Sequence, residues 1–362
     1  MGNERVDVAV VGGGVTGLAC ARTLAQAGLA VRVLEARTVG GGASGRNGGF
    51  GVRGPALPYV ALPFPELWRF TERALDRLAE LAGDAFRRVG CLSVAAAEEE
   101  LVAFRLERDA LVEAGFAAEL VGRDELPRVL RPHFLGGFLS PRDGALEPGR
   151  WSRRLAGLAA EAGAAIAEGT RALSLDGTRV LTDAGTVEAE HVVLATDGYT
   201  LGLAPELDAL VTPARAQVLA TAPLSERHFD CPVGARGGWD YWQQTQDGRL
   251  VIGGWRDTEL EREYTTEDEP TDSVQARIEE FLRRLFGEVP PITHRWAGLL
   301  GLTPDRLPLA GRLPGRENVW ASVGYCGHGN VLALGCGELV AGAILGREDP
   351  LLAVFDPARL GL

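Results

Sequence analysis

VDVAVVGGGVTG, residues Val6 to Gly17, is the stretch that decides the fold of this chain. Its apolar residues Val8–Val11 are typical of a buried parallel strand, and they lead directly into the G-x-G-x-x-G pattern Gly12–Gly17. The next residues, Leu18–Ala27, have the composition of a helix. A strand, a glycine-rich turn and a helix in this order predict a dinucleotide-binding unit; an ordinary glycine-rich turn is the alternative.

The glycines and a later acid have separate tasks in such a unit. Gly12 allows the tight turn, Gly14 lets a pyrophosphate approach the backbone, and Gly17 lets the helix lie close to the strand. Backbone amides and the positive end of the helix dipole then bind the phosphates. A second strand, Ala30–Leu34, delivers Glu35, 18 residues beyond Gly17, where a carboxylate accepts hydrogen bonds from a ribose diol. This unit alone leaves NAD and FAD equally possible.

Length and composition limit the class of protein. The 362 residues, 46% of them hydrophobic, suggest two globular domains. A formal charge of −12 argues against a nucleic-acid partner. Five scattered cysteines without a C-x-x-C pair favour a reducing cytoplasm, and we expect no signal peptide, no membrane span and no metal site. All 37 basic residues are arginine, which excludes any mechanism that needs a lysine.

A second glycine cluster, residues 40–50, follows soon after Glu35. We expect a loop that runs flat along a planar ligand, with side-chain donors from Ser44, Arg46 and Asn47. The alternative is a flexible surface loop. The position of this loop directly after Glu35, the predicted ribose-binding acid, favours the interpretation that it binds a ligand.

The next part of the chain, residues 55–139, does not continue a simple βαβ series. Its pattern predicts a helix over about Pro65–Leu81, a short strand Gly90–Ala95 and an amphipathic helix Glu98–Glu113. We interpret it as part of an inserted second domain.

The chain then returns to helix and strand. After a helix over Ser152–Ala162, the apolar run His191–Thr196 predicts a buried strand that opens into a turn at Asp197–Tyr199. A core strand that ends in a glycine turn commonly forms a ligand edge, but an ordinary turn is equally possible.

An antiparallel segment follows, with strands predicted over Arg215–Ala222, Asp240–Gln246 and Arg249–Gly253. Aromatic residues crowd this hairpin and form either cross-strand packing or the wall of a pocket. A charged helix over Thr271–Phe286 ends the segment.

A third glycine cluster, Gly324–Asn330, lies between a predicted strand, Asn318–Val323, and a helix of small residues, Val331–Leu345. A glycine-rich lead into a helix N-terminus makes another anion site. Three such clusters in one chain suggest a long ligand that is bound in several pieces, which favours FAD over a nicotinamide cofactor.

With these motifs, the chain resembles the FAD-dependent amine and amino-acid oxidoreductases of the D-amino-acid oxidase superfamily, the group of glycine oxidase, sarcosine oxidase and gamma-glutamylputrescine oxidase. The resemblance covers most of the chain. The segments that carry it are, in order, GGGVTG with Glu35, SGRNGG, EPGRW, EGTRALSL, VVLATDGYT, DGRLVIGG, GLTPDRLP and GYCGHGN.

The resemblance implies an α/β fold of two domains. A Rossmann-like FAD-binding domain would comprise residues 1–54, 140–213 and 295–362. A second domain with a mainly antiparallel β-sheet would comprise residues 55–139 and 214–294 and bind the substrate.

It further implies one FAD extended along the chain. The N-terminal motif and Glu35 would hold the ADP half, Ser44–Gly48 would run beside the pyrophosphate and flavin, and Thr196 would close the site near the ribityl chain. The residues expected to bind the cofactor are Gly12, Gly14, Val15, Thr16, Gly17, Glu35, Ala36, Arg37, Ser44, Gly45, Arg46, Asn47, Gly48, Gly49, Ala172, Thr196, Asp197, Gly198, Gly301, Gly324, Gly327, His328, Gly329, Asn330 and Val331.

The final motif carries the expected chemistry. A helix N-terminus at Gly329–Val331, aimed at the N1/O2 edge of the flavin, would stabilise negative charge on the reduced ring. His328 and Asn330 are the candidate catalytic residues, because their side chains could add hydrogen bonds there. A purely structural histidine is as good an explanation of His328.

Two departures from the resembled enzymes matter. Members with covalent flavin carry a cysteine in the segment that reads Ala297–Leu299 here, so we expect non-covalent FAD. Sarcosine oxidases use a lysine near the flavin to assist the reaction with oxygen, and this chain has none. Either another group promotes oxygen reduction, or electrons pass to a different acceptor.

The expected reaction is oxidation of a C–N bond in an amine or amino acid, by hydride transfer to N5 of the flavin and hydrolysis of the resulting imine. For the substrate we expect Arg53 as a carboxylate clamp and an aromatic wall of Tyr241, Trp242 and Trp255. The alternatives are a dehydrogenase with an acceptor other than oxygen and a non-catalytic FAD-binding subunit. The sequence does not decide the oligomeric state.

Overall fold

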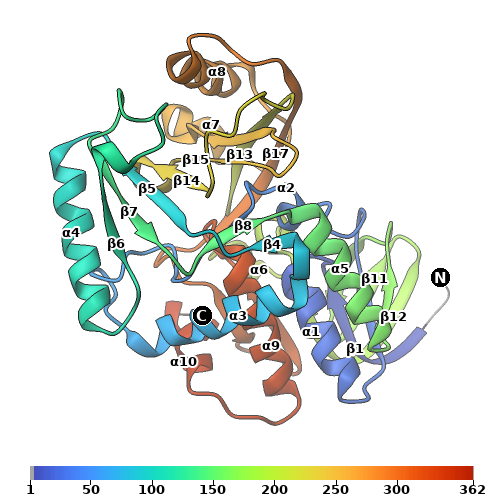
Figure 1. The fold of residues 1–362 in the computed structure, drawn as a ribbon. Coiled ribbons are helices and arrows are strands. Elements are labelled where there is room, and N and C mark those ends of the chain that lie inside the picture. Colours follow the sequence, from blue (N-terminus) through green and yellow to red (C-terminus); the bar gives the residue numbers. More distant parts are fainter. Residues whose placement is uncertain (1–3, 362) are drawn as a thin grey trace.

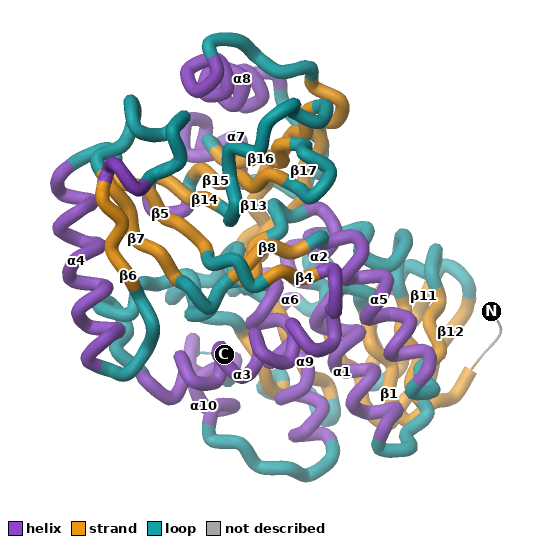
Figure 2. The backbone as a smooth tube through the Cα atoms, viewed as in Figure 1, coloured by secondary structure: helices purple, strands orange, loops and turns teal. Residues whose placement is uncertain are grey.

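The computed structural model describes residues 4–361, and within them the strands form two large sheets and one small one (Figure 1). Figure 2 shows the strands of the two large sheets as two separate groups, each with helices against it. The chain passes between these two sheets several times. Segments far apart in sequence therefore meet where the sheets face each other.

The first sheet has a parallel centre in the order β9-β2-β1-β12-β19. The residue ranges of these five strands are β1 Glu4–Val11, β2 Val31–Leu34, β9 Ala165–Ala167, β12 Gly185–Leu194 and β19 Val319–Val323. Antiparallel strands extend it, namely β10 (Ala172–Asp176), β11 (Arg179–Thr182) and β18 (Leu309–Arg312). This arrangement confirms the predicted α/β fold.

Both faces of the first sheet are buried, as is usual for parallel strands. Val8 and Val10 of β1 point into a core built with helices on one face, while Ala9 and Val11 point into a second core on the other. The helices of the first core are α1 (Val15–Gln26), α3 (Pro65–Ala82), α5 (Pro148–Glu161), α9 (Gly329–Ile344) and α10 (Leu351–Phe355). The short α6 (Pro205–Asp208) contributes to the second core.

Helices α1 and α9 lie against each other despite their separation in sequence (Figure 1). A Cβ on Gly337 of α9 would collide with the backbone carbonyl oxygen of Thr16 in α1. The absence of a side chain at position 337 therefore allows the two helix backbones to approach closely. Both helices begin at the same edge of the sheet, because each follows a strand of its parallel centre.

The second large sheet is mainly antiparallel, with the order β17-β13-β16-β15-β14-β5-β7-β6. Only β14 and β5 pair in parallel. The residue ranges are β5 Cys91–Ala95, β6 Glu119–Gly122, β7 Gly136–Ser140, β13 Thr212–Thr221, β14 Val233–Ala235, β15 Asp240–Gln244, β16 Leu250–Gly254 and β17 Ile292–Leu302. Helix α8 (Asp272–Phe286) covers one face, and α4 (Glu98–Glu113) packs near β6 and β7.

A third, small sheet consists of β3 (Phe50–Gly51), β8 (Gly144–Leu146) and β4 (Phe86–Arg87). Its strand β3 begins at the end of the second glycine cluster. That cluster contains one helical turn, α2 (Ala43–Arg46), in place of the continuous loop expected from its glycines. No helix in residues 4–361 is both long and apolar enough to cross a membrane.

The element predictions are largely confirmed. The expected helices over 65–81, 98–113 and 271–286 correspond to α3, α4 and α8. The domain boundary at residue 295 differs from the sheet pairing, because the long strand β17 continues to Leu302 and pairs with β13 of the second sheet. Residues 295–302 thus belong to the second sheet by hydrogen bonding.

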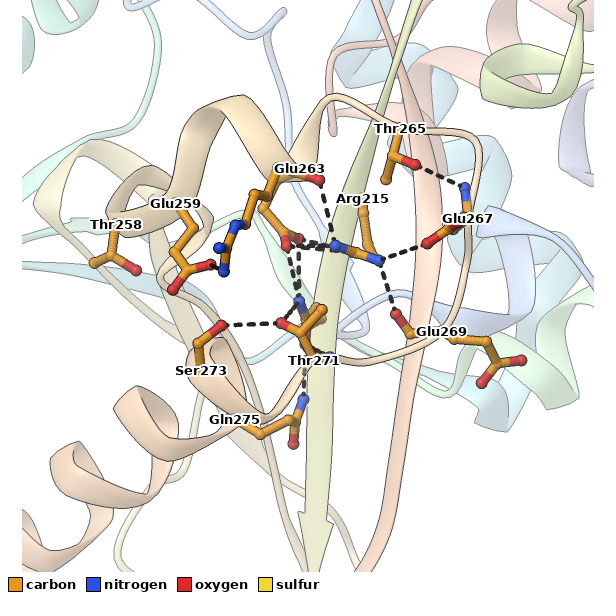
Figure 3. Close-up of polar contacts among 12 residues, drawn as sticks. Arg215, Thr258, Glu259, Glu263, Thr265, Glu267, Glu269, Thr271, Ser273 and Gln275 are labelled. Carbon is orange, nitrogen blue, oxygen red and sulfur yellow. Dashed lines mark hydrogen bonds and ion pairs between the residues drawn. The ribbon is translucent and has the colours of Figure 1, made fainter.

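A strap, defined as residues 255–271 and including α7 (Leu260–Glu263), leaves β16 and returns to α8. Its middle is fixed by a buried ion pair between Arg215 of β13 and Glu263, with a shortest distance of 2.8 Å (Figure 3). Gln217 of β13 donates to the same carboxylate and accepts a hydrogen bond from the backbone N–H of Thr271. The strap is therefore bonded to the second sheet at two points.

Replacing Glu263 by alanine should lower the free energy of unfolding by about 3–5 kcal/mol, because the buried guanidinium of Arg215 would lose its counter-charge. Urea unfolding followed by circular dichroism measures this loss. Glu261→Ala is the matched control, since Glu261 is exposed and makes no ion pair among the described residues. Equal losses in both variants would contradict the assigned role of the pair.

Candidate active site

A cleft of about 1240 Å³, counting the part open to solvent, lies at the carboxyl ends of β1, β2, β12 and β19. This is where ligands bind in open parallel sheets. The predicted cofactor residues that line it are Gly12, Gly14, Thr16, Glu35, Ala36, Arg37, Ser44, Asn47, Ala172, Thr196, Asp197, Gly327, Gly329 and Asn330. The structure therefore brings the three glycine clusters together around one cavity.

The turn after β1 has the geometry that its glycines predict. Gly12 has φ 111°, and a Cβ there would collide with the carbonyl oxygen of Ala195. A Cβ on Gly14 would lie 2.8 Å from Oγ of Ser44, which accepts a hydrogen bond from the N–H of Val15. Gly17 lies beneath the turn, against the carbonyl oxygen of Gly12, and does not line the cleft. It shapes the turn from below.

Glu35 lies at the end of β2, as predicted. One carboxylate oxygen accepts a hydrogen bond from the N–H of Gly13 at 2.8 Å, and the other accepts one from the N–H of Arg37 at 2.8 Å. These bonds fix the side chain at the cleft wall. Because a carboxylate offers about four acceptor positions, Glu35 keeps capacity for a ribose diol.

Asp197 connects three segments beside the cleft. Its Oδ1 accepts hydrogen bonds from the N–H groups of Gly324 and Tyr325, at 2.8 and 3.2 Å, and its Oδ2 accepts one from Gly301 at 3.2 Å. Burial raises the pKa of this carboxyl, and the backbone donors oppose that rise. Gly301 and Gly324 act here through Asp197, since neither lines the cleft. Gly198 packs against the backbone of Leu300.

The loop after α2 is tied to the start of α9 by two side-chain amides. Asn47 and Asn330 exchange reciprocal hydrogen bonds of 3.2 and 3.0 Å, and Asn330 also donates to the carbonyl of Phe50 at 2.7 Å. Gln243 of β15 donates to the carbonyls of Gly48 and Gly49 from the other side. The side chain of Asn330 thus ties these two loops together, and Asn330 also lines the cleft.

His328 is the N-cap residue of α9 and gives that helix no side-chain cap within the described residues. Its Nδ1 is buried and has no hydrogen-bond partner in residues 4–361. Burial lowers the pKa of the imidazole, so the ring is neutral at pH 7. His328 adjoins the cleft-lining residues Gly327 and Gly329 without lining the cleft itself.

The remaining predicted cofactor residues lie around the cleft wall. Val15 and Val331 are buried in the first turns of α1 and α9. Gly45 and Arg46 line a second, more open cavity between α2, the strap and β17. The guanidinium of Arg46 donates to the carbonyl of Ala297 and to Asp268.

Arg53 is not available as a carboxylate clamp, which corrects the sequence-based expectation. Its buried guanidinium donates to Asp143 and to Glu72, both at 2.8 Å, and to the carbonyl of Ala117 at 3.1 Å. Burial raises the pKa of Asp143 to about 6, although the adjacent Arg53 opposes the rise. Arg53 is a structural cation within its own ion-pair network.

The predicted aromatic wall divides between the two faces of the second sheet. Trp242 is 1% exposed and packs on Phe281 of α8, with ring centroids 5.1 Å apart. Trp255 packs on the same phenylalanine. Tyr241 points the opposite way, because neighbouring residues of a strand alternate in direction, and its ring leaves no room for a Cβ on Gly48. Of the three, only Tyr241 faces the glycine loops.

Sequence reasoning missed two tyrosines of the cleft. Tyr199 lies with its ring 5.1 Å from the guanidinium carbon of Arg37 and donates a hydrogen bond to Asp268. Tyr325 is buried at the cleft, where its hydroxyl group bonds to Thr16 and Ser322. Both directly follow glycine turns, which was the available signal.

Arg256, at the start of the strap, was also missed. Its guanidinium lies 4.5 Å from the ring centroid of Trp239, and burial lowers its pKa. Within residues 4–361 it forms no ion pair, because Arg236 binds the two nearby carboxylates, Asp240 and Asp257. Arg256 is half-buried, and a guanidinium without an ion pair at such a site is costly to desolvate.

Together the parallel sheet, the glycine turns and Glu35 define a protein that binds a dinucleotide at the carboxyl edge of its sheet. The chain belongs to the family described as FAD dependent oxidoreductase, whose model matches residues 7–343. It is therefore an FAD-dependent oxidoreductase.

Curated relatives agree with this family. The chain is 33% identical to a probable oxidoreductase, OrdL, of Rhizobium meliloti, over 97% of this chain and 85% of the relative. It is 29% identical to gamma-glutamylputrescine oxidoreductase of Escherichia coli, over 96% and 86% of the two chains. The crystal structure of glycine oxidase from Geobacillus kaustophilus has the same fold, with a TM-score of 0.85, 23% identity and coverage of 98% and 99%.

The cleft fits FAD on its own geometry. A Cβ on Gly14 would crowd the turn where a diphosphate must approach, so the absence of a side chain leaves this approach open. The start of α9, which has no side-chain cap within residues 4–361, lies at the other end of the cleft, where Gly329 and Asn330 line it. Phosphate donors and a second helix N-terminus are thus both present for one extended cofactor.

Asp197→Asn should weaken FAD binding and lower the free energy of unfolding by about 1–3 kcal/mol. One amide oxygen cannot replace both carboxylate oxygens, so at least one buried N–H facing Asp197 would lose its acceptor. Titration of the apoprotein with FAD, followed by quenching of flavin fluorescence, measures the affinity.

Asp208→Asn is the control for this prediction, because Asp208 accepts hydrogen bonds from Gly202 at an exposed site. An FAD affinity of Asp197→Asn within twofold of the wild type would contradict the connecting role of Asp197.

Proposed function

We propose that this enzyme oxidises the C–N bond of an amine or amino acid, giving an imine that hydrolyses to a carbonyl compound and an amine. FAD, when bound, supplies the acceptor for the hydride that leaves the substrate carbon. The proposal rests above all on the uncapped N-terminus of α9 beside the loop tied by Asn47 and Asn330. Its relatives, which include a gamma-glutamylputrescine oxidoreductase and glycine oxidases, support the proposal.

The chain contributes electrostatics and orientation to this reaction. The free N–H groups in the first turn of α9 carry the positive end of the helix dipole, which would stabilise a negatively charged part of a bound cofactor. His328 stays neutral and offers an unpaired ring nitrogen at the same helix start. The substrate must bind with its amine deprotonated. Orienting its α-carbon for hydride transfer then needs no dedicated acid–base pair.

We propose that Arg256, in place of Arg53, binds a carboxylate of the substrate. Its guanidinium forms no ion pair within residues 4–361, although the charge of the neighbouring Asp257 acts on it, and it stacks on Trp239. Tyr241, whose ring packs beside Gly48 and Phe50, and Cys326 of the third glycine cluster are also near enough to act on this charge. These neighbours belong to the two loops expected around the flavin ring. An anionic group of the substrate would supply the missing counter-charge.

We also propose that FAD is bound without a covalent bond. The segment Ala297–Leu299 contains no cysteine. Cys326 lies nearer the cleft, but its thiol interacts with Thr303, and burial raises the thiol pKa. A protonated thiol is a poor nucleophile. The first sheet would bind FAD and the second would shape the substrate site.

The reaction can be tested by anaerobic mixing of the FAD-loaded enzyme with candidate amines and amino acids. We expect the flavin absorbance near 450 nm to bleach with at least one of them, about one equivalent of hydride per flavin. Admitting oxygen, or adding an artificial acceptor, then identifies the acceptor from the rate at which colour returns. A loaded enzyme that no amine or amino acid reduces would refute the proposal.

Arg256→Met should raise KM for an amino acid about 10- to 100-fold, which corresponds to the loss of a charge-assisted hydrogen bond. KM for the matching amine, which has the same structure without the carboxylate, should change much less. Steady-state kinetics with such a substrate pair measures the difference. Arg262→Met is the control, because Arg262 lies on the same strap with its side chain 77% exposed. Equal KM changes for both substrates would exclude Arg256 as the clamp.

A further inference from the structure

We infer that Asp268, which the second-sheet strap carries, is a positioning residue for the cofactor site: it holds the rim of the FAD cleft closed and slows FAD release. The carboxylate is 15% exposed, and one of its oxygens, Oδ2, accepts hydrogen bonds from three residues. These are Nη1 of Arg37 at 2.5 Å, Nη1 of Arg46 at 3.1 Å and the hydroxyl group of Tyr199 at 3.1 Å.

The three partners come from three separate segments of the cofactor-binding side. Arg37 follows β2, Arg46 ends α2 and Tyr199 follows β12. Arg37 and Tyr199 line the cleft directly, and Arg46 belongs to the helical turn whose residues Ala43 and Ser44 line it. A single carboxylate thus gives three parts of the rim a shared hydrogen-bond partner, in addition to the direct contact between Arg37 and Tyr199. We expect FAD release to require that these bonds open.

The strap holds Asp268 in place independently of the cofactor-binding side. Glu263, five residues before it, forms the buried pair with Arg215, and Thr271, three residues after it, is bonded to Gln217 (Figure 3). The carbonyl of Glu269, the next residue, accepts a further hydrogen bond from Arg215 at 3.2 Å. The carboxylate is therefore presented at a fixed position, and its loss should leave the strap folded.

Two opposing effects of Asp268 on FAD can be separated. Its negative charge repels a diphosphate, which would weaken binding. Against this, it orders two long arginine side chains whose rotamer freedom would otherwise be lost on binding. The charges of Arg37 and Arg46 face the one charge of Asp268, while Glu35 also acts on Arg37. Hydrogen bonding to Arg37 and the charges of both arginines hold the pKa of Asp268 below its usual value, against the effect of burial. We therefore expect ordering to prevail.

The test uses the FAD-loaded enzyme and follows FAD release after dilution by the gain of flavin fluorescence. Asp268→Asn should release FAD about tenfold faster, the loss expected for charge-assisted hydrogen bonds. Glu269→Gln is the matched control, because it removes the same charge at the next residue. The side chain of Glu269 is exposed and makes no bond within the described part of the chain. Its release rate should stay within twofold of the wild type.

Further variants distinguish positioning from general stabilisation. In the Arg46→Met background, Asp268→Asn should accelerate FAD release by a smaller factor than it does in the wild type, because part of the same interaction is already absent. Tyr199→Phe, which removes only one hydroxyl group, should accelerate release about two- to threefold. Thermal unfolding of the apoproteins should differ little between Asp268→Asn and Glu269→Gln.

Release of FAD from Asp268→Asn at the wild-type rate or more slowly would overturn the inference, since repulsion of the diphosphate would then prevail. Additive effects of Asp268→Asn and Arg46→Met would overturn it as well. The measurement needs no substrate, so failure of the proposed amine oxidation would leave its outcome unaffected.

Discussion

The close contact between α1 and α9 is the constraint on which the cofactor site depends. Each helix begins directly after a parallel strand of the first sheet, and Gly337 lets their backbones approach at Thr16. The hydroxyl groups of Thr16 and Tyr325 join the two helix starts at 3.1 Å. Two positive helix ends therefore face one cleft, although more than 300 residues separate them in sequence. A bulkier helix surface would move one of these ends out of the site.

The second sheet completes the site from one face only. Its strands place Trp242, Ile252 and Leu219 against α8, where they form a core. The opposite face presents Tyr241 and Gln243, which contact the loop after α2. Strand β15 thus stabilises its own domain and at the same time shapes the loop after α2. This alternation explains why neighbouring aromatic residues have different roles, and it could have been applied to the hairpin from the sequence.

Local features were predictable because they are written in consecutive residues. The G-x-G-x-x-G turn, Glu35 and the helix over 98–113 follow from spacing and periodicity. The partners of the arginine side chains could not be predicted in this way, because ion pairing depends on which segments the fold brings together. Arg53 meets Asp143, and Arg37 meets Asp268 across 231 positions of the chain. Nothing near either arginine in the sequence distinguishes a structural cation from a ligand-binding one.

The net charge of −12 conceals this local distribution. Acidic residues neutralise most enclosed arginines, as Glu263 does for Arg215. The balance differs at two places: Arg37 and Arg46 share Asp268 at the cleft rim, and Arg256 forms no ion pair among the described residues. Since a buried charge without full compensation is costly, an anion bound beside either place would be stabilised. An acidic protein can in this way keep local sites that favour an anion.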